Sequence, residues 1–261
     1  MIASSISSNS TVSVRKLPEA DASAIALLAA AQYDDFEDYW DSPREFVEPI
    51  NFRRNGWSAV TLLSVPDSNG HECRFYLKRQ ENQLRYSWRH PLGALTYQFE
   101  VDAFHRAEEF QLPTAELVTY GFRKVGQANR GIVVTRELSC FALSHFREMD
   151  VQWQELLTPL RAAGLQLLQM HLSGWQHGAL YPAHLFIDFD TGMIRLIDLE
   201  RARRAAPQKA ASADLQQFLK RAEWLPDEAL AAFLEPYRTD MPGLLNSLSK
   251  RFPHRSVALQ E

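Results

Sequence analysis

The amino-acid sequence changes character near residue 138, and this change limits the folds that the chain can adopt. Before it, runs of β-branched and aromatic residues at 59–65 and 73–77 flank the turn residues Pro66-Asp67-Ser68-Asn69-Gly70, which predicts a β-hairpin. After it, apolar residues recur at helical spacing over 151–172, and one short hairpin is expected at 185–197. The sequence therefore predicts an α+β protein with a small β-rich lobe followed by a mainly helical lobe.

The 261 residues fall into four expected segments. A Ser-rich tail at 1–19, expected to be disordered, precedes an accessory segment at 20–47, in which the apolar spacing over 20–39 predicts one amphipathic helix. The β-rich lobe is expected at 48–138 and the helical lobe at 139–261. Further elements are predicted as strands at 115–120 and 131–135 and as helices at 95–110, 210–220 and 228–234.

Composition excludes several classes of protein. The 28 Lys and Arg residues are balanced by 32 Asp and Glu residues, for a net charge of −4, which argues against a chain built to coat nucleic acid. The longest uncharged run, 162–187, is interrupted by glutamines, histidines and a proline, so no transmembrane helix is expected. Two cysteines, Cys73 and Cys140, are too few for a disulfide framework and favour a cytoplasmic protein.

A series of residues suited to nucleotide chemistry occurs along the chain in a fixed order. The series is Gly56 and Ser58 at the entry to the first hairpin, Lys78 at the end of its second strand, Glu100 on the next helix, His177 and His184 in a loop, and Asp198 after a strand. Protein kinases use a glycine turn, a lysine paired with a helix glutamate, a catalytic loop and a metal-binding aspartate in this order. Each residue taken alone is also explained by an ordinary turn, surface or capping role.

Each member of the series has a physical role in such a site. Gly56 would let backbone amides approach a triphosphate, and Ser58 would add a hydroxyl donor. Lys78 would place a positive charge on the phosphates, oriented by an ion pair with Glu100. Asp198 would hold Mg²⁺ through its carboxylate oxygens.

The loop at 177–187 matches the kinase catalytic-loop template position by position, with two substitutions. Ala179 stands where the template has its catalytic aspartate, and His184 stands where it has the metal-binding asparagine. His177 would serve as a substitute base, since imidazole titrates near neutrality, although a buried packing role is the more common one. For His184, contact with a metal or phosphate and a role in the core are equally compatible with the sequence.

The combination of motifs resembles the InaA family of lipopolysaccharide-kinase-like proteins over residues 48–237. The matching motifs are Glu48-Pro49, Arg53-Arg54-Asn55-Gly56, Leu77-Lys78-Arg79, His177-Gly178 with Tyr181 and His184, and Asp198-Leu199-Glu200 with Arg203 and Arg204. The resemblance implies a bilobal protein-kinase-like fold, with ATP and Mg²⁺ as cofactors. It also implies a partner that is a lipopolysaccharide core or another phosphorylatable envelope sugar, with peripheral contact at the inner face of the inner membrane left open.

Three functions remain open at this point. The first is an ATP-dependent phosphotransferase acting on a lipopolysaccharide core sugar or related envelope precursor, and the second is a pseudokinase, which Ala179 favours. An adaptor that binds no nucleotide is the third. Arg201, Arg203 and Arg204 would suit phosphates on an acidic glycan or form a solvated basic loop. Asp214 would anchor the catalytic loop from below or act as a charge at a helix start.

Overall fold

The computed structural model describes residues 15–16, 22–43, 45–87, 90–109 and 111–260, and the chain divides into two units. The first unit comprises residues 1–98 and 116–137, and the second comprises residues 99–115 and 138–261. The first is built on an antiparallel sheet and the second is mainly helical, which confirms the predicted α+β class. The predicted tail lies outside the described residues, except that Arg15 and Lys16 form strand β1.

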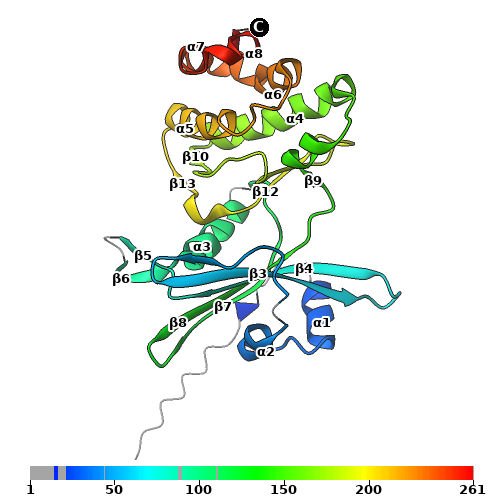
Figure 1. The fold of residues 1–261 in the computed structure, drawn as a ribbon, viewed down its shortest axis with the longest axis vertical. Coiled ribbons are helices and arrows are strands. Elements are labelled where there is room, and N and C mark those ends of the chain that lie inside the picture. Colours follow the sequence, from blue (N-terminus) through cyan, green and yellow to red (C-terminus); the bar gives the residue numbers. More distant parts are fainter. Residues whose placement is uncertain (1–14, 17–21, 44, 88–89, 110, 261) are drawn as a thin grey trace, which may run out of the picture. The chain divides into compact units, whose positions relative to one another are not determined.

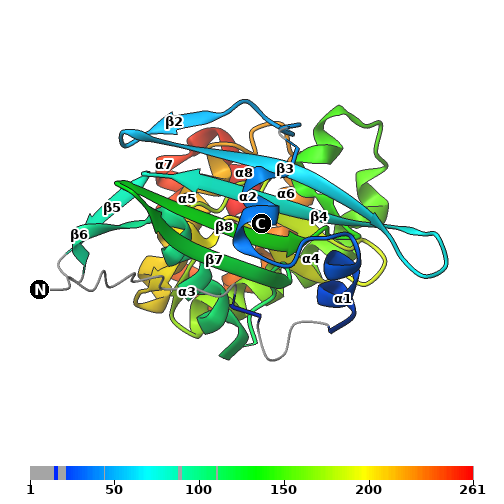
Figure 2. The same cartoon turned by 90° about the horizontal axis from the view of Figure 1, so that it is seen from below.

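The first unit contains a six-stranded antiparallel sheet in the order β1-β7-β8-β4-β3-β2 (Figures 1 and 2). Its other strands are β2 (Asn51–Arg53), β3 (Gly56–Pro66), β4 (Glu72–Glu81), β7 (Leu117–Val125) and β8 (Ala128–Arg136). The predicted turn joins β3 and β4. In it, the Oδ1 atom of Asp67 accepts hydrogen bonds from the backbone N–H groups of Asn69 and His71, and Gly70 has a φ of 81°. Strands β5 (Leu84–Ser87) and β6 (His90–Leu95), which the sequence analysis did not predict, pair separately.

Alternate residues of β4 serve the two faces of this sheet. Helices α1 (Ala22–Ala30) and α2 (Phe36–Asp41) cover one face (Figures 1 and 2), where Phe75 and Leu77 join their apolar core. The buried Arg79 follows on that face, and its guanidinium donates to the carbonyl oxygens of three residues and to a side-chain hydroxyl; the partners are Trp40, Ser42, Pro43 and the Oγ1 atom of Thr61. Because strand side chains alternate, Lys78 belongs to the opposite face.

The accessory segment differs from the prediction of one helix over 20–39, which is wrong. Residue 32 interrupts the helix, since Gln32 takes a φ of 64°. Asp35 then caps α2 by accepting hydrogen bonds from the backbone N–H groups of Glu37 and Asp38. The acidic cluster that the sequence analysis treated as a break in one apolar face is therefore the start of a second helix.

The second unit consists of packed helices with two small sheets (Figure 1). The helices are α3 (Thr96–Glu109), whose first turn belongs to the first unit, α4 (Trp153–Leu172), α5 (Pro207–Leu219), α6 (Asp227–Asp240), α7 (Pro242–Arg251) and α8 (Ser256–Gln260). Strands β9 (Phe141–Ala142), β11 (Leu185–Ile187) and β12 (Ile194–Leu196) form one sheet, and β10 (Trp175–Gln176) pairs with β13 (Arg203–Arg204). The predicted β11–β12 hairpin is confirmed, with Asp188 Oδ1 accepting from the N–H groups of Asp190 and Thr191.

Helices α4 and α6 approach each other closely at a glycine. A Cβ atom at Gly164 would overlap the carbonyl oxygen of Phe233, so only glycine fits there. This contact belongs to the core that supports the loop at 177–184. No helix in the described ranges is long and apolar enough to span a membrane.

Candidate active site

The loop at 177–184 follows β10, and a buried carboxylate holds its first turn. Asp214 of α5 accepts hydrogen bonds from the backbone N–H groups of His177 (2.6 Å) and Gly178 (2.8 Å). The prediction that Asp214 anchors the loop is therefore confirmed. The alternative of a charge at a helix start is wrong, because α5 begins at Pro207 and Asp214 lies about two turns further on.

Asp214 is itself part of a buried network that joins three helices. The Nε2 atom of His171 (α4) lies 3.2 Å from Asp214 Oδ2, and its Nδ1 atom lies 2.8 Å from the hydroxyl of Tyr237 (α6). Because a carboxylate only accepts, the ring of His171 donates through Nε2–H to Asp214, and its Nδ1 atom forms a hydrogen bond with the Tyr237 hydroxyl. Burial, and then the charge of Asp214, raises the pKa of Tyr237 and keeps that hydroxyl protonated. The loop is thus fixed to the helical core through charge-assisted hydrogen bonds.

His177 has protein partners at both ring nitrogens. Its Nε2 atom lies 3.0 Å from the carbonyl oxygen of Ile197, so Nε2–H is the donor, and Nδ1 accepts from the N–H of Ala179 at 3.3 Å. Burial lowers the pKa of His177 although the charge of Asp214 opposes this effect, so the neutral ring is favoured. This geometry favours the packing role that the sequence analysis weighed against a role as substitute base.

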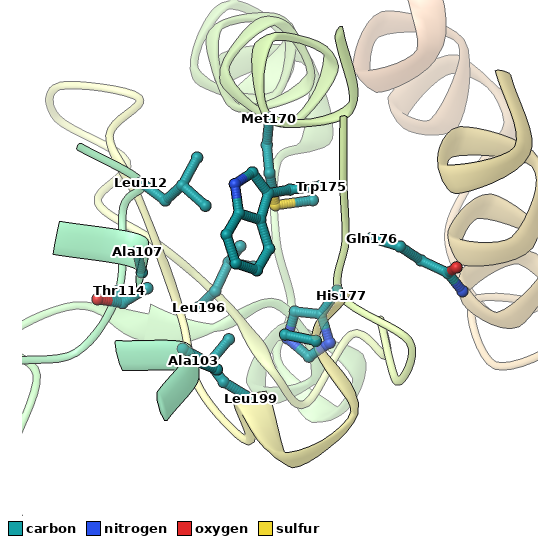
Figure 3. Close-up of a pocket in the computed structure, with 11 residues that line it drawn as sticks. Ala103, Ala107, Leu112, Thr114, Met170, Trp175, Gln176, His177, Leu196 and Leu199 are labelled. Atoms are coloured by element: carbon teal, nitrogen blue, oxygen red, sulfur yellow. The ribbon is translucent and has the colours of Figure 1, made fainter. Parts of the chain in front are cut away.

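The His177 ring also borders an apolar pocket within the second unit (Figure 3). Ala103 and Ala107 of α3 line it together with Leu199, which follows Asp198 in the chain. The two alanines leave space beside the imidazole that larger side chains would fill. The pocket is part of the packing that supports His177, and it offers few polar groups to a ligand.

His184 and Asp198 form the pair of chemical groups that comes together at the end of the loop. The Nδ1–H of His184 donates to the carbonyl oxygen of Ala179 at 2.9 Å, which leaves Nε2 facing Asp198 Oδ2 at 3.6 Å. The side chain of Asp198 is 40% exposed and that of His184 is 19% exposed. In the neutral ring Nε2 carries a lone pair, so two electron-pair donors face one another and would share a proton or a cation between them.

The backbone of Asp198 supports this interpretation. Asp198 has φ 60° and ψ 58°, in the left-handed region that a residue with a side chain rarely occupies. Such strain costs on the order of 1 kcal/mol or more and concentrates at functional positions. Asp198 lies between strand β12 and the turn Leu199–Arg201, so its backbone conformation orients the carboxylate beside His184.

The donor set at this pair fits a magnesium ion only together with a phosphorylated ligand. Among the described residues, no group of three or more His, Cys, Asp or Glu side chains is placed to hold a metal. Mg²⁺ prefers oxygen ligands and typically takes one or two carboxylates, with phosphates and water supplying the rest. Asp198 meets that requirement, whereas the imidazole of His184 is a less suitable ligand for Mg²⁺ and suits a phosphate contact as well.

The loop carries no carboxylate of its own. Ala179, in the position of the template aspartate, is 2% exposed, and its methyl group is buried in the second unit. Its backbone is fully used, because its N–H donates to His177 and its carbonyl accepts from His184. The position therefore organises the two histidines and supplies no proton acceptor.

The remaining predicted residues are divided between the two units. Gly56 follows a turn in which Arg54 and Asn55 have positive φ values of 54° and 60°, and a Cβ at Gly56 would overlap the backbone of Glu81. The close packing of strands thus already requires this glycine. Ser58 is buried on β3.

Lys78 and Glu100 are the two predicted partners of an ion pair. Lys78 is half-buried in β4 of the first unit, opposite Val60 of β3, and Glu100 is buried in α3 within the second unit. Their pairing, and the nucleotide contacts of Gly56 and Ser58, remain predictions.

The predicted arginine cluster is largely occupied by protein partners. Arg201 pairs with Glu200 at 3.6 Å, Arg203 donates to Gln176 and Arg204 donates to the carbonyl oxygen of Ser173. The sequence analysis missed Arg221, whose guanidinium carbon lies 3.8 Å from the centre of the Tyr181 ring. No local sequence pattern indicates this contact, because Tyr181 and Arg221 are forty residues apart in the chain.

Comparison with known proteins agrees with the motifs in this site. A sequence model described as "Lipopolysaccharide kinase (Kdo/WaaP) family" matches residues 37–237. Protein InaA of Escherichia coli (strain K12) is 28% identical over 211 residues, which cover 77% of this chain and 94% of that protein. The family match includes strands β2 to β8, the anchored loop and Asp198. The α+β architecture is consistent with a kinase-like fold. The chain therefore belongs to the lipopolysaccharide kinase (Kdo/WaaP) family.

Proposed function

We propose that the protein is an ATP-dependent phosphotransferase of the lipopolysaccharide kinase type, acting on a lipopolysaccharide core sugar or related envelope precursor. Family membership suggests a kinase-like function on a lipopolysaccharide-related substrate. The observation that carries the proposal is the convergence of His184 Nε2 and a strained, accessible Asp198 carboxylate at 3.6 Å. A carboxylate and an imidazole nitrogen at the end of an anchored loop are groups that would contact a cation and a phosphate oxygen.

Each residue then has a defined task. Bound ATP with Mg²⁺ would supply the phosphoryl group and offset its negative charge. Asp198 would hold the cation, His184 would contact the cation or a phosphate oxygen, and Asp214 keeps the loop backbone in place. Lys78, oriented by Glu100, would neutralise phosphate charge, and the backbone at Gly56 with the hydroxyl of Ser58 would contact phosphate oxygens.

Ala179 supports a second candidate, a pseudokinase that binds nucleotide or a partner without transferring phosphate. A positioned base contributes about 10²–10⁴-fold to a rate, and no carboxylate is present at this position. Phosphoryl transfer nevertheless depends mainly on positioning and on charge neutralisation, because its transition state is loose. A slow phosphotransferase is therefore compatible with Ala179, and experiment separates the two candidates.

The first measurement is the thermal shift caused by millimolar ATP with Mg²⁺. A ligand at a hundredfold its dissociation constant stabilises by about 2.7 kcal/mol, which corresponds to about 5–11 °C for a chain of this size. Asp198→Asn should reduce the shift, whereas Asp190→Asn, in an exposed turn, should leave it intact. Absence of any shift in the parent would contradict the phosphotransferase and a nucleotide-binding pseudokinase, and would leave only a pseudokinase that binds a partner.

The second measurement is transfer of radiolabelled phosphate from ATP to dephosphorylated core oligosaccharide. Transfer by the parent supports the phosphotransferase, and a thermal shift without transfer supports the pseudokinase. Ala179→Asp should raise transfer by up to about 10²–10⁴-fold if only the base is missing. Asp198→Ala in the Ala179→Asp background should abolish it; activity that persists would indicate a contaminating kinase.

A further inference from the structure

One face of α5 follows the loop from its first turn to its middle. Asp214 accepts from the N–H groups at the start of the loop, and Gln217 donates through Nε2 to the carbonyl oxygen of Gly178 at 2.9 Å. Arg221, just beyond the end of the helix, places its guanidinium carbon 3.8 Å from the centre of the Tyr181 ring. Asp214 and Gln217 lie three residues apart on one face of α5, and Arg221 follows in the turn after the helix. The segment that anchors the loop therefore also places a guanidinium beside it.

The hydrogen-bond donors of Arg221 are available to a ligand. Arg221 is exposed, and within the part of the chain that the structure describes its guanidinium has no hydrogen-bonding or ion-pairing partner. The exposed arginines Arg201, Arg203 and Arg204 each have a polar partner in the protein. Stacking on a ring restrains the plane of a guanidinium without using its N–H groups. Arg221 is therefore restrained by Tyr181, with its donors free for an oxyanion.

Tyr181 also connects this arginine to the reactive pair. The centres of the Tyr181 and His184 rings are 4.9 Å apart, and His184 Nε2 lies 3.6 Å from Asp198 Oδ2. Residues 177–184 contain no Lys, Arg, Asp or Glu. Arg221 therefore places a permanent positive charge beside the loop, and the Tyr181 ring lies between it and His184.

We propose that Arg221, held by Tyr181, forms a subsite for an oxyanion carried by the acceptor sugar, either a phosphate monoester or a carboxylate. This inference rests on the proposed function and adds the chemical class of the acceptor. A guanidinium binds either group through two parallel hydrogen bonds. An acceptor anchored in this way would present a neighbouring hydroxyl to the region of His184 and Asp198, with binding energy compensating in part for the missing loop carboxylate.

The test measures binding of purified lipopolysaccharide core oligosaccharide by calorimetry in the absence of nucleotide. Three forms are compared: untreated, dephosphorylated by phosphatase, and with its carboxylates reduced. Arg221→Gln should weaken binding of the untreated form by about 10–100-fold, and Arg221→Lys should weaken it less. Tyr181→Leu should also weaken it, because the guanidinium loses its restraint. Arg161→Gln is the matched control, since it removes an exposed arginine of α4 that pairs with Glu235 of α6.

The three forms identify the oxyanion. If it is a phosphate, the effect of Arg221→Gln disappears with the dephosphorylated form, and if it is a carboxylate, the effect disappears with the reduced form. The proposal would be overturned by an effect equal to that of Arg161→Gln, by an effect that persists in both treated forms, or by no binding to the parent. So would a loss of affinity for ATP with Mg²⁺ in place of the oligosaccharide. Arg221-dependent binding without phosphate transfer would leave the subsite standing and refute the phosphotransferase.

Discussion

Removal of the Asp214 carboxylate should destabilise the whole second unit. The carboxylate is buried and accepts three hydrogen bonds, from the backbone N–H groups of His177 and Gly178 and from the ring of His171. Hydrogen bonds to a charged group contribute about 1.5–3 kcal/mol each, and the lower end of that range for three bonds gives about 4.5 kcal/mol. We therefore expect Asp214→Ala to lower the free energy of unfolding by about 4–5 kcal/mol, or the melting temperature by about 8–20 °C.

Two further variants make this prediction specific to the carboxylate. Asp214→Asn keeps the shape and one acceptor oxygen, so it should lose less, on the order of 2 kcal/mol. Asp190→Ala removes an exposed aspartate in the β11–β12 turn and should change the melting temperature by less than about 2 °C. Differential scanning fluorimetry of the four proteins gives the comparison. If Asp214→Ala melts within 2 °C of the parent, the carboxylate does not hold the loop.

Three more substitutions test other parts of the structure. Arg79→Met keeps the buried stem but leaves three backbone carbonyls without their donor, so urea unfolding should show a loss of about 3–5 kcal/mol; a loss below 1 kcal/mol would show that the guanidinium is dispensable. In the same urea unfolding experiment, Gly178→Ala should lower the free energy of unfolding clearly more than Gly70→Ala. Both glycines have φ near 80°, but only at Gly178 would a Cβ atom meet a backbone oxygen, that of Arg201 at 2.6 Å. Because the pKa of His177 is lowered in the folded state, the unfolded chain binds more protons than the folded chain below about pH 6.5. The free energy of unfolding should therefore decrease as the pH decreases, by at most about 1.4 kcal/mol per pH unit from this residue. An equally steep decrease from pH 7 to pH 5 in His177→Gln would contradict this.

Elements whose signal is local were predictable from the sequence. The β3–β4 and β11–β12 turns depend on Asp67 and Asp188, whose side chains bind backbone N–H groups two to four residues ahead. Helix α4 was found from its apolar spacing. Helix α7 was not predicted, although Leu244, Leu245 and Leu248 of its buried face have helical spacing, since a ten-residue helix gives only a weak periodic signal.

The candidate site was predictable where a residue acts through its own motif, and less so where it acts through a distant partner. His184 and Asp198 were identified from the loop template, and the structure brings them together. The neutral state of His177 depends on the carbonyl of Ile197, twenty residues away. The position of the Arg221 guanidinium depends on its stacking contact with Tyr181, which lies forty residues earlier in the chain. Such contacts depend on tertiary packing, which no local pattern encodes.

The close approach of α4 and α6 links helix packing to the chemistry of the loop. Gly164 lies seven residues, or two helical turns, before His171, and Phe233 lies four residues before Tyr237, so the crossing point and the buried network share the same pair of helices. A single methyl group at position 164 would push the helices apart and pull the tyrosine hydroxyl away from the imidazole. A mutation far from any bound nucleotide or sugar can therefore displace the loop by changing the distance between these two helices.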